Sequence, residues 1–310
     1  MLAIIIPYYK FTFFEATLES LANQTDKRFK VYIGDDASPE NSNWLLEKYN
    51  EKFNLVYQRF EQNLGGVSLT QQWERCIAFS GDEEWVMILG DDDVLGENVV
   101  AEFYNNLSEI IENHINVIRF STYKINEIGK QKTSLYTHPK IESSKDFFFK
   151  RRSRSSLSEY VFNKQVVKKI KFKNFPLAWY SDYLAILEFS NFGNIFTINN
   201  AFVKIRVSTS SISGSGSFNY QKDKARVAYY GYLLTHKKMF FNKQEIKELF
   251  WMLNKTYLNN KKNIYLLFEI SIVYIRNRFI TDYFVFIMSI MGKRNNLRQG
   301  NSNTEKGYFL

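Results

Sequence analysis

The first hundred residues alternate between short apolar runs and segments in which apolar residues recur every three or four positions. The runs at residues 3–7, 29–33 and 85–89 are typical of buried strands. Residues 15–23 and 68–79 place their apolar positions on one face of a helix. Strands separated by helices of this length predict right-handed crossovers and a largely parallel sheet. The pattern therefore predicts an α/β fold.

The alternation continues further along the chain and then gives way to long helices. We expect a helix at 99–113, a strand at 117–123, turns or a hairpin at 126–138, and strands mixed with helices up to residue 206. Residues 147–154 begin with three Phe and become basic, which suggests a flexible loop over a phosphate-bearing site.

A serine-rich segment marks the end of the main domain. Residues 208–217 hold six Ser and two Gly, a composition typical of mobile loops or linkers. The segment either closes over a bound ligand or serves as a linker. We expect an α/β domain over 1–217, a basic and aromatic helical extension over 218–294, and a disordered polar tail over 295–310.

Charge and composition restrict the partners of the chain. Its 310 residues carry a net charge of +9 and an isoelectric point near 9.3, which favours anionic partners. Nucleic-acid binding is disfavoured, because no helix-turn-helix, zinc or base-stacking signature accompanies the charge and the acidic clusters would stay unexplained. The single cysteine, Cys76, is expected to be packed rather than reactive.

Three features bear on membranes. The apolar start of the chain has no basic segment before it and predicts a first strand, so we expect synthesis in the cytoplasm. Charged residues interrupt the apolar stretch 263–292, which argues against a simple membrane span. Basic residues alternate with aromatic residues over 220–294 and indicate peripheral contact with an anionic membrane. Packing of these helices on the main domain or on a second subunit is the alternative.

Three consecutive carboxylates, Asp91, Asp92 and Asp93, directly follow the apolar run 85–89 and Gly90. A buried strand that ends in this way delivers acids to the carboxyl edge of a sheet, where open α/β folds bind ligands. Carboxylates are preferred ligands of Mg²⁺ and Mn²⁺, which often carry substrate phosphates. The alternative is a solvated acidic turn that caps the following helix.

Two further loops are predicted at the same edge. Asp35 and Asp36 end the second strand, and the glycines of residues 63–66 follow the third. Together the three loops offer an acid for a base or ribose, glycines for close backbone approach and acids for a metal on a diphosphate. The spacing matches neither a dinucleotide-binding fingerprint nor a phosphate loop, because the chain lacks both glycine patterns.

At several independent positions these motifs resemble family 2 glycosyltransferases of the GT-A fold. Residues 4–9 resemble the first strand of the family, residues 20–25 the end of its first helix, and residues 34–38 its Asp-Asp-Gly-Ser turn. The resemblance covers roughly residues 1–210. It implies a nucleotide-sugar half at about 1–125, an acceptor half at about 126–217, and a mainly parallel mixed sheet flanked by helices.

The resemblance also implies the roles of the acidic residues. Asp36 contacts the nucleotide base, Asp91 or Asp92 the ribose, and Asp93 binds the metal, Mg²⁺ or Mn²⁺. Gly90 stands where the family has its first acid, and the Arg-Asn pair of the family in the preceding helix is unmatched. The nucleotide-binding residues implied in this way are Pro7, Tyr9, Asp36, Asn63, Gly65, Asp91, Asp92 and Arg206.

Asp182 occupies the place of the general base in the family, after Ser181 in place of the usual Glu. Such a base removes the proton of the acceptor hydroxyl; without the resemblance, an N-cap role would be favoured. Arg206 is expected to neutralise the leaving diphosphate, and a solvated arginine at a strand end is the alternative.

The resemblance implies an inverting, metal-dependent glycosyltransferase. Its donor would be a UDP-sugar, its acceptor a glycan or lipid-linked saccharide, and its role the synthesis of surface polysaccharide at the cytoplasmic face of the cell membrane. A nucleotidyltransferase of similar architecture and a non-catalytic binding protein with the same fold remain alternatives.

Overall fold

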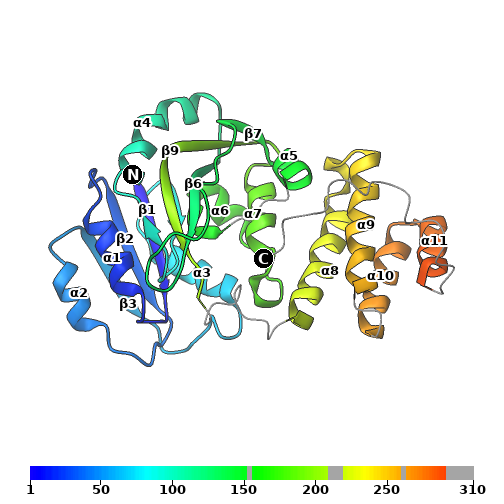
Figure 1. Ribbon diagram of the computed structural model, residues 1–310, viewed down its shortest axis with the longest axis horizontal. Helices are drawn as coiled ribbons and strands as arrows, with labels where there is room; N and C mark the ends of the chain where they lie inside the picture. Colours follow the sequence, from blue (N-terminus) through cyan, green and yellow to red (C-terminus); the bar gives the residue numbers. More distant parts are fainter. Residues whose placement is uncertain (152–155, 209–218, 260–262, 291–310) are drawn as a thin grey trace. The chain divides into compact units, whose positions relative to one another are not determined.

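The computed structural model describes residues 1–151, 156–208, 219–259 and 263–290 (Figure 1). The strands are β1 (Leu2–Tyr8), β2 (Phe29–Asp35), β3 (Asn54–Arg59), β4 (Trp85–Ile88), β5 (Val94–Leu95), β6 (Val117–Ile125), β7 (Ile141–Ser143), β8 (Tyr160–Asn163) and β9 (Asn194–Arg206). The helices are α1 (Phe14–Ala22), α2 (Asn43–Tyr49), α3 (Leu69–Ala78), α4 (Val99–Glu112), α5 (Ser144–Asp146), α6 (Lys164–Ile170), α7 (Ser181–Phe189), α8 (Asn219–His236), α9 (Lys243–Asn259), α10 (Ile264–Arg276) and α11 (Ile280–Ile290). The chain forms two compact units, Met1–Ala225 and Arg226–Leu310.

The first unit is built on one mixed sheet with the order β3-β2-β1-β4-β8-β6-β9-β5, with β7 beside β9. Strand β1 runs parallel to β2 and β4, and β6 runs parallel to β9. Because β8 is antiparallel to both β4 and β6, those two strands point the same way. The carboxyl ends of β1, β2, β3, β4, β6 and β9 therefore lie at one edge, which confirms the predicted mainly parallel α/β sheet.

Both faces of this sheet are buried, and β1 shows the reason in its sequence. Its even-numbered residues, from Leu2 to Tyr8, enter one core, whereas Ala3 and Ile5 enter the other. Helices α1, α2 and α4 supply the first core, and α3, α6 and α7 supply the second. A strand buried on both faces carries apolar residues at successive positions instead of alternating with polar ones. The result is three layers, helix on sheet on helix.

Several predicted segments can be compared with the structure. The expected hairpin is confirmed, because Thr122 pairs with Tyr136 and Ile125 with Gln131. The loop expected at 147–154 is wrong for its first part, because Phe147–Arg151 forms a π-helix. The ring of Phe147 is buried under the guanidinium of Arg119, 4.8 Å away, so the apolar start of this segment packs. The basic remainder of this segment, residues 152–154, lies outside the described residues, as do residues 209–217 of the serine-rich segment and the tail 295–310.

The second unit has a small aromatic core of its own. The ring of Tyr274 on α10 lies 4.5 Å from that of Phe250 on α9 and 5.8 Å from that of Phe286 on α11. The Tyr274 hydroxyl also forms hydrogen bonds with the side-chain amide of Asn254. Among the described helices, none is both long and apolar enough to cross a membrane.

Candidate functional site

Two acidic loops flank the end of β1. The backbone N–H of Asp36 donates to the carbonyl of Tyr8 at 2.9 Å, and that of Leu89 donates to the carbonyl of Ile5 at 2.8 Å. The turn after β2 and the loop after β4 are thus both held to the same strand. The structure confirms that the two predicted acidic segments lie at one edge of the sheet.

Asp91 joins the loop after β4 to the backbone that leaves β1. Its carboxylate accepts hydrogen bonds from the backbone N–H of Tyr9 at 2.9 Å and of Lys10 at 2.8 Å. Burial and the nearby charge of Asp92 raise the pKa of Asp91 to about 6, while these two N–H groups lower it. Asp91 therefore fixes the position of Tyr9, one of the residues predicted to bind nucleotide.

Asp93 is buried and ties its loop to β9. One carboxylate oxygen accepts a hydrogen bond from the backbone N–H of Arg206 at 2.8 Å. The carbonyl of Asp93 accepts another from the hydroxyl of Thr17 at 2.9 Å. The metal ligand predicted from the sequence is thus held in place from two directions.

Arg206 is also buried, which excludes a solvated arginine at the strand end. Its guanidinium donates to the carbonyls of Asp92, Asn126 and Glu127 at 2.8 to 2.9 Å, and lies 4.4 Å from the ring centre of Phe13. Burial lowers the pKa of Arg206, and the charges of Asp92 and Asp93 raise it. The side chain therefore joins the loops that follow β4 and β6.

Gly90 leaves room for the carboxylates that follow it. A Cβ at this position would lie 3.0 Å from Oδ1 of Asp92 and 3.2 Å from Oδ2 of Asp93. Two carboxylate oxygens from neighbouring residues thus approach one point beside the Gly90 backbone. A hard divalent cation commonly takes one or two carboxylates and completes its shell with phosphate and water. The donor set fits such an ion, although the described residues hold no cluster of three or more metal-ligating side chains.

Asp36 is almost fully engaged with the loop after β3. Its carboxylate accepts hydrogen bonds from the backbone N–H of Leu64 at 2.7 Å and of Gly65 at 2.8 Å. A Cβ at position 65 would overlap the Asp36 carboxylate, so the glycine allows this close approach. Burial raises the pKa of Asp36, while the two N–H groups and Arg75 lower it. In the same loop, the Asn63 side chain accepts from the N–H of Gly66 at 2.7 Å.

Arg75 on α3 is a site residue that the sequence did not predict. Its guanidinium forms an ion pair with Asp36, donates to the carbonyl of Gln62 at 2.9 Å, and lies 3.9 Å from the ring centre of Phe60. One turn earlier on α3, Gln72 donates to the carbonyl of Gly34 at 3.1 Å. The available signal was the spacing of Gln72 and Arg75, which lie three residues apart in the predicted helix 68–79 and therefore share one helix face.

Asp35 stabilises the turn from inside. It is fully buried, and its carboxylate accepts from the N–H of Ser38 at 2.7 Å and from the guanidinium of Arg59 at 2.8 Å. It also accepts from the hydroxyl of Tyr57 at 2.5 Å, and burial with this contact raises the pKa of Tyr57 to about 12. Ala37, between the acids and Ser38, has a φ of 55° and occupies the left-handed region that favours glycine. The turn keeps its shape without the glycine of the family pattern.

Asp182 lies in the first turn of α7. Burial raises its pKa to about 6, while backbone N–H groups at the helix start lower it. The neighbouring rings of Tyr180 and Tyr183 lie 5.9 Å apart, and Tyr180 precedes the helix in a left-handed conformation. Ser181, in place of the usual acid, is buried and donates to the carbonyl of Lys173 at 2.7 Å.

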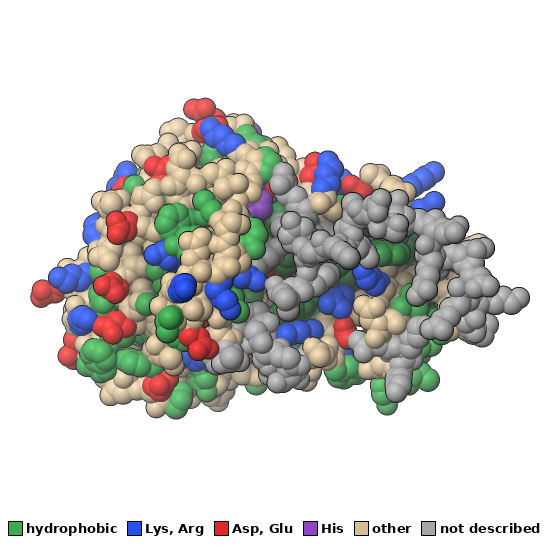
Figure 2. Space-filling model, viewed as in Figure 1, with side chains coloured by type: hydrophobic (Ala, Val, Ile, Leu, Met, Phe, Trp, Pro, Cys, Tyr) green, Lys and Arg blue, Asp and Glu red, His purple; other side chains and the backbone are tan. Residues whose placement is uncertain are grey.

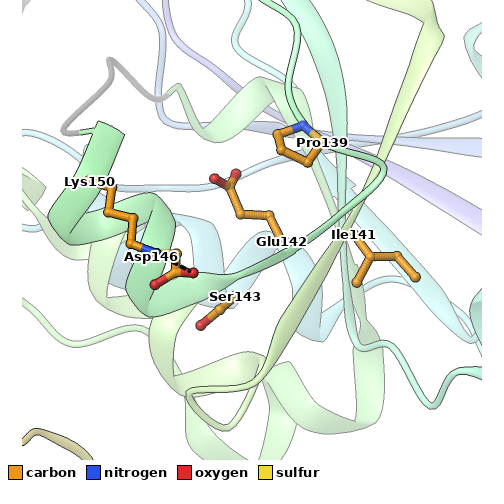
Figure 3. A pocket seen from close by; sticks show the side chains of 6 residues that line it. All are labelled: Pro139, Ile141, Glu142, Ser143, Asp146 and Lys150. Carbon is orange, nitrogen blue, oxygen red and sulfur yellow. Dashed lines mark ion pairs between the residues drawn. The ribbon is translucent and has the colours of Figure 1, made fainter.

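A shallow pocket of about 510 Å³ lies elsewhere in the first unit (Figure 3). Its lining residues are Pro139, Ile141, Glu142, Ser143, Asp146 and Lys150. Strand β7, which contributes to this lining, pairs with the start of β9, whereas Arg206 is at the end of β9. Glu142 also forms an ion pair with the buried Arg119 at 3.0 Å. The pocket is therefore separate from the acidic loops.

Comparison with known proteins gives one family. The model of glycosyl transferase family 2 matches residues 3–170. The glycosyltransferase GlyG of Streptococcus pneumoniae serotype 4 (strain ATCC BAA-334 / TIGR4) is 22% identical over 110 residues, which are 35% of this chain and 36% of GlyG. The chain thus matches only about a third of the length of that relative.

Solved structures with the same fold include S. aureus TarS. One TarS structure is 17% identical, with a TM-score of 0.59 over 83% of this chain and 43% of TarS. A second, TarS 1–349 in complex with UDP-GlcNAc, is 16% identical, with a TM-score of 0.59 over 83% of this chain and 72% of that fragment. At these identities the likeness shows the fold.

Proposed function

The chain belongs to glycosyl transferase family 2, and from this premise we propose that it transfers a sugar from a UDP-sugar to a hydroxyl group. The acceptor is a glycan or a lipid-linked saccharide, in the synthesis of a surface polysaccharide. UDP is proposed because TarS 1–349, which shares the fold, was crystallised with UDP-GlcNAc. One observation carries the proposal: two acidic loops meet at the end of β1, with the oxygens of Asp92 and Asp93 converging beside Gly90.

The nucleotide would lie along the end of β1. Asp36, which Arg75 and the N–H groups of the loop after β3 hold in position, would contact the base. Pro7 near the end of β1, Tyr9 directly after β1, and Asn63 and Gly65 in the loop after β3 would complete the nucleotide site. The ribose is assigned to Asp91 or Asp92.

Asp93, with Asp92 beside it, would hold Mg²⁺ or Mn²⁺. Such an ion, when bound, would supply positive charge against the diphosphate leaving group. Arg206 holds the loop that carries both carboxylates, because its guanidinium donates to the carbonyl of Asp92 and its backbone N–H donates to the carboxylate of Asp93. We therefore propose that Arg206 positions the acidic loop, in addition to its predicted role of neutralising charge on the leaving diphosphate.

Asp182 would act as the general base. With a pKa near 6, its carboxylate is mostly ionised at neutral pH and still basic enough to accept a proton. It takes the proton of the acceptor hydroxyl while that oxygen forms a bond to the anomeric carbon. The bond between that carbon and the diphosphate oxygen breaks on the opposite face, which inverts the configuration and releases UDP.

The test is a product analysis with UDP-GlcNAc and other UDP-sugars, Mn²⁺ and a panel of saccharide acceptors. The proposal expects a glycosylated product of inverted anomeric configuration and release of UDP, both lost in Asp93→Asn. Release of pyrophosphate would indicate a nucleotidyltransferase instead. Binding of UDP without turnover on any acceptor would indicate a non-catalytic binding protein.

A further inference from the structure

The net charge of the chain lies in its second unit. Residues 226–310 hold 14 Lys and Arg against five Asp and Glu, which equals the +9 of the whole chain. The first unit is therefore neutral, and Figure 2 shows acidic and basic side chains mixed over its visible face. A charge confined to one unit selects an anionic partner for that unit.

Helix α10 carries an apolar stripe that faces away from its core. Its buried residues, Leu266, Ile270 and Tyr274, follow the helical repeat. On a helix of 3.6 residues per turn, Ile264, Phe268 and Ile275 lie together on a different face. They are 71%, 65% and 58% exposed. Arg276 follows directly at the end of the helix.

Helix α11 repeats this arrangement. Phe286 is its buried residue, whereas Phe284, Val285 and Met288 are 63%, 68% and 55% exposed. Ile280, one turn before Phe284, is 46% exposed and extends the stripe. Tyr274 and Phe286 already give these helices an aromatic core, so the two stripes are apolar surface beyond what their packing requires.

The length of the helices restricts what the stripes can bind. At 1.5 Å per residue, the 13 residues of α10 and the 11 of α11 span roughly 20 Å and 16 Å. A bilayer core is about 30 Å thick, so neither helix crosses it. Short helices with one exposed apolar face and surrounding cations are typical of segments that lie in the membrane interface.

We propose that the exposed stripes of α10 and α11 dock on an anionic lipid surface. The apolar side chains enter the interface, and the excess Lys and Arg of the second unit meet the headgroups. A second copy of the chain fits less well, because two units of charge +9 repel each other. The proposal extends the proposed function. Only the link between docking and a lipid-linked acceptor rests on that function.

The test is co-sedimentation of the full chain with vesicles of phosphatidylcholine alone or of phosphatidylcholine mixed with phosphatidylglycerol. We expect binding to the mixed vesicles and little to the neutral ones. Phe268→Asp and Phe284→Asp should each weaken vesicle binding about tenfold, because each removes an aromatic side chain that would be buried in the membrane interface. Met239→Asp is the matched control: it introduces the same charge at a residue that is 82% exposed outside both stripes.

The other outcomes overturn the proposal. Vesicle binding that is unchanged in both stripe variants, or absent from the wild type, contradicts it. A wild-type dimer that becomes monomeric in Phe284→Asp, without vesicle binding, would assign the stripe to a second copy. UDP binding is measured on the same samples: if it fails while vesicle binding holds, the proposed function fails and the docking surface stands.

Discussion

The carboxylate of Asp93 accepts a hydrogen bond of 2.8 Å from the backbone N–H of Arg206. This contact joins residues from the loop after β4 and the last position of β9, which are 113 positions apart in the sequence. The Arg206 side chain also donates a hydrogen bond to the carbonyl of Asp92 in the same loop. The acidic loop is therefore positioned by a buried cation.

Arg206→Met should destabilise the protein by about 2–4 kcal/mol, because the carbonyls of Asp92, Asn126 and Glu127 lose the charged donor that a buried side chain supplies. Urea denaturation measures the change in unfolding free energy. Lys204→Met, at a half-buried position of the same strand, is the control and should change it by less than about 1 kcal/mol. Equal effects of the two substitutions would contradict the role assigned to the guanidinium.

Gly90→Ala should weaken Mn²⁺-dependent UDP binding about tenfold. The added methyl group would stand 3.0 Å from Oδ1 of Asp92 and 3.2 Å from Oδ2 of Asp93, and would displace one of them. Calorimetric titration with and without Mn²⁺ separates this effect from a general loss of UDP affinity. Metal dependence identical to that of the wild type would show that the two oxygens do not act together.

Transfer activity should rise with pH around the pKa of Asp182, which burial raises to about 6. The ionised carboxylate is the base, so the rate should fall about tenfold for each pH unit below this value and level off above it. The pH dependence of kcat/KM measures this directly. A rate that stays constant from pH 5 to 8 would exclude Asp182 as the titrating base.

The same raised pKa affects stability. Above about pH 6 the carboxylate of Asp182 is ionised in both folded and unfolded protein, and burial penalises the folded form. As the pH falls from about 6 towards 4, the group becomes protonated in the folded state and the penalty is progressively lost. Asp182→Asn should therefore stabilise the protein by about 1–2 kcal/mol at pH 7 and by much less at pH 4. If the unfolding free energies of the wild type and Asp182→Asn differed equally at both pH values, burial of the Asp182 carboxylate would not be the cause.

Arg75→Lys should raise KM for the donor about tenfold and leave kcat nearly unchanged. A lysine keeps the charge but cannot bridge Asp36 and the Gln62 carbonyl while stacking on Phe60. Steady-state kinetics with varied UDP-sugar measures the split. Arg28→Lys, at an exposed residue that pairs with Asp26, is the control and should change neither constant. A tenfold fall in kcat in Arg75→Lys would show that Arg75 also contributes to steps after nucleotide binding.

The sheet was predictable because its signal is local. The apolar residues of β1 enter both cores, and the acids that follow β2 and β4 reach one edge as a consequence of parallel pairing. The contacts within the site were less predictable, since they join distant positions. Arg75 reaches Asp36 across 39 positions, and Tyr57 reaches Asp35 across 22. The spacing of apolar residues along the chain does not predict which distant residues form such pairs.

Two local departures also became clear only in three dimensions. The sequence showed that Gly90 replaces an acid of the family pattern, but the space that it leaves for Asp92 and Asp93 depends on how the loop folds. Phe147 belongs to a segment whose basic end suggested a loop, yet its ring packs under Arg119. Tertiary contacts decided both cases.

The central claim is that the edge at the end of β1 binds a nucleoside diphosphate through a metal held by Asp93. Calorimetric titration of UDP, with and without Mn²⁺, on the wild type and on Asp93→Asn tests it most directly. The account predicts binding that requires Mn²⁺ and is lost in Asp93→Asn, while the variant keeps its fold by circular dichroism. UDP binding that is equally tight without Mn²⁺, or in Asp93→Asn, would contradict it.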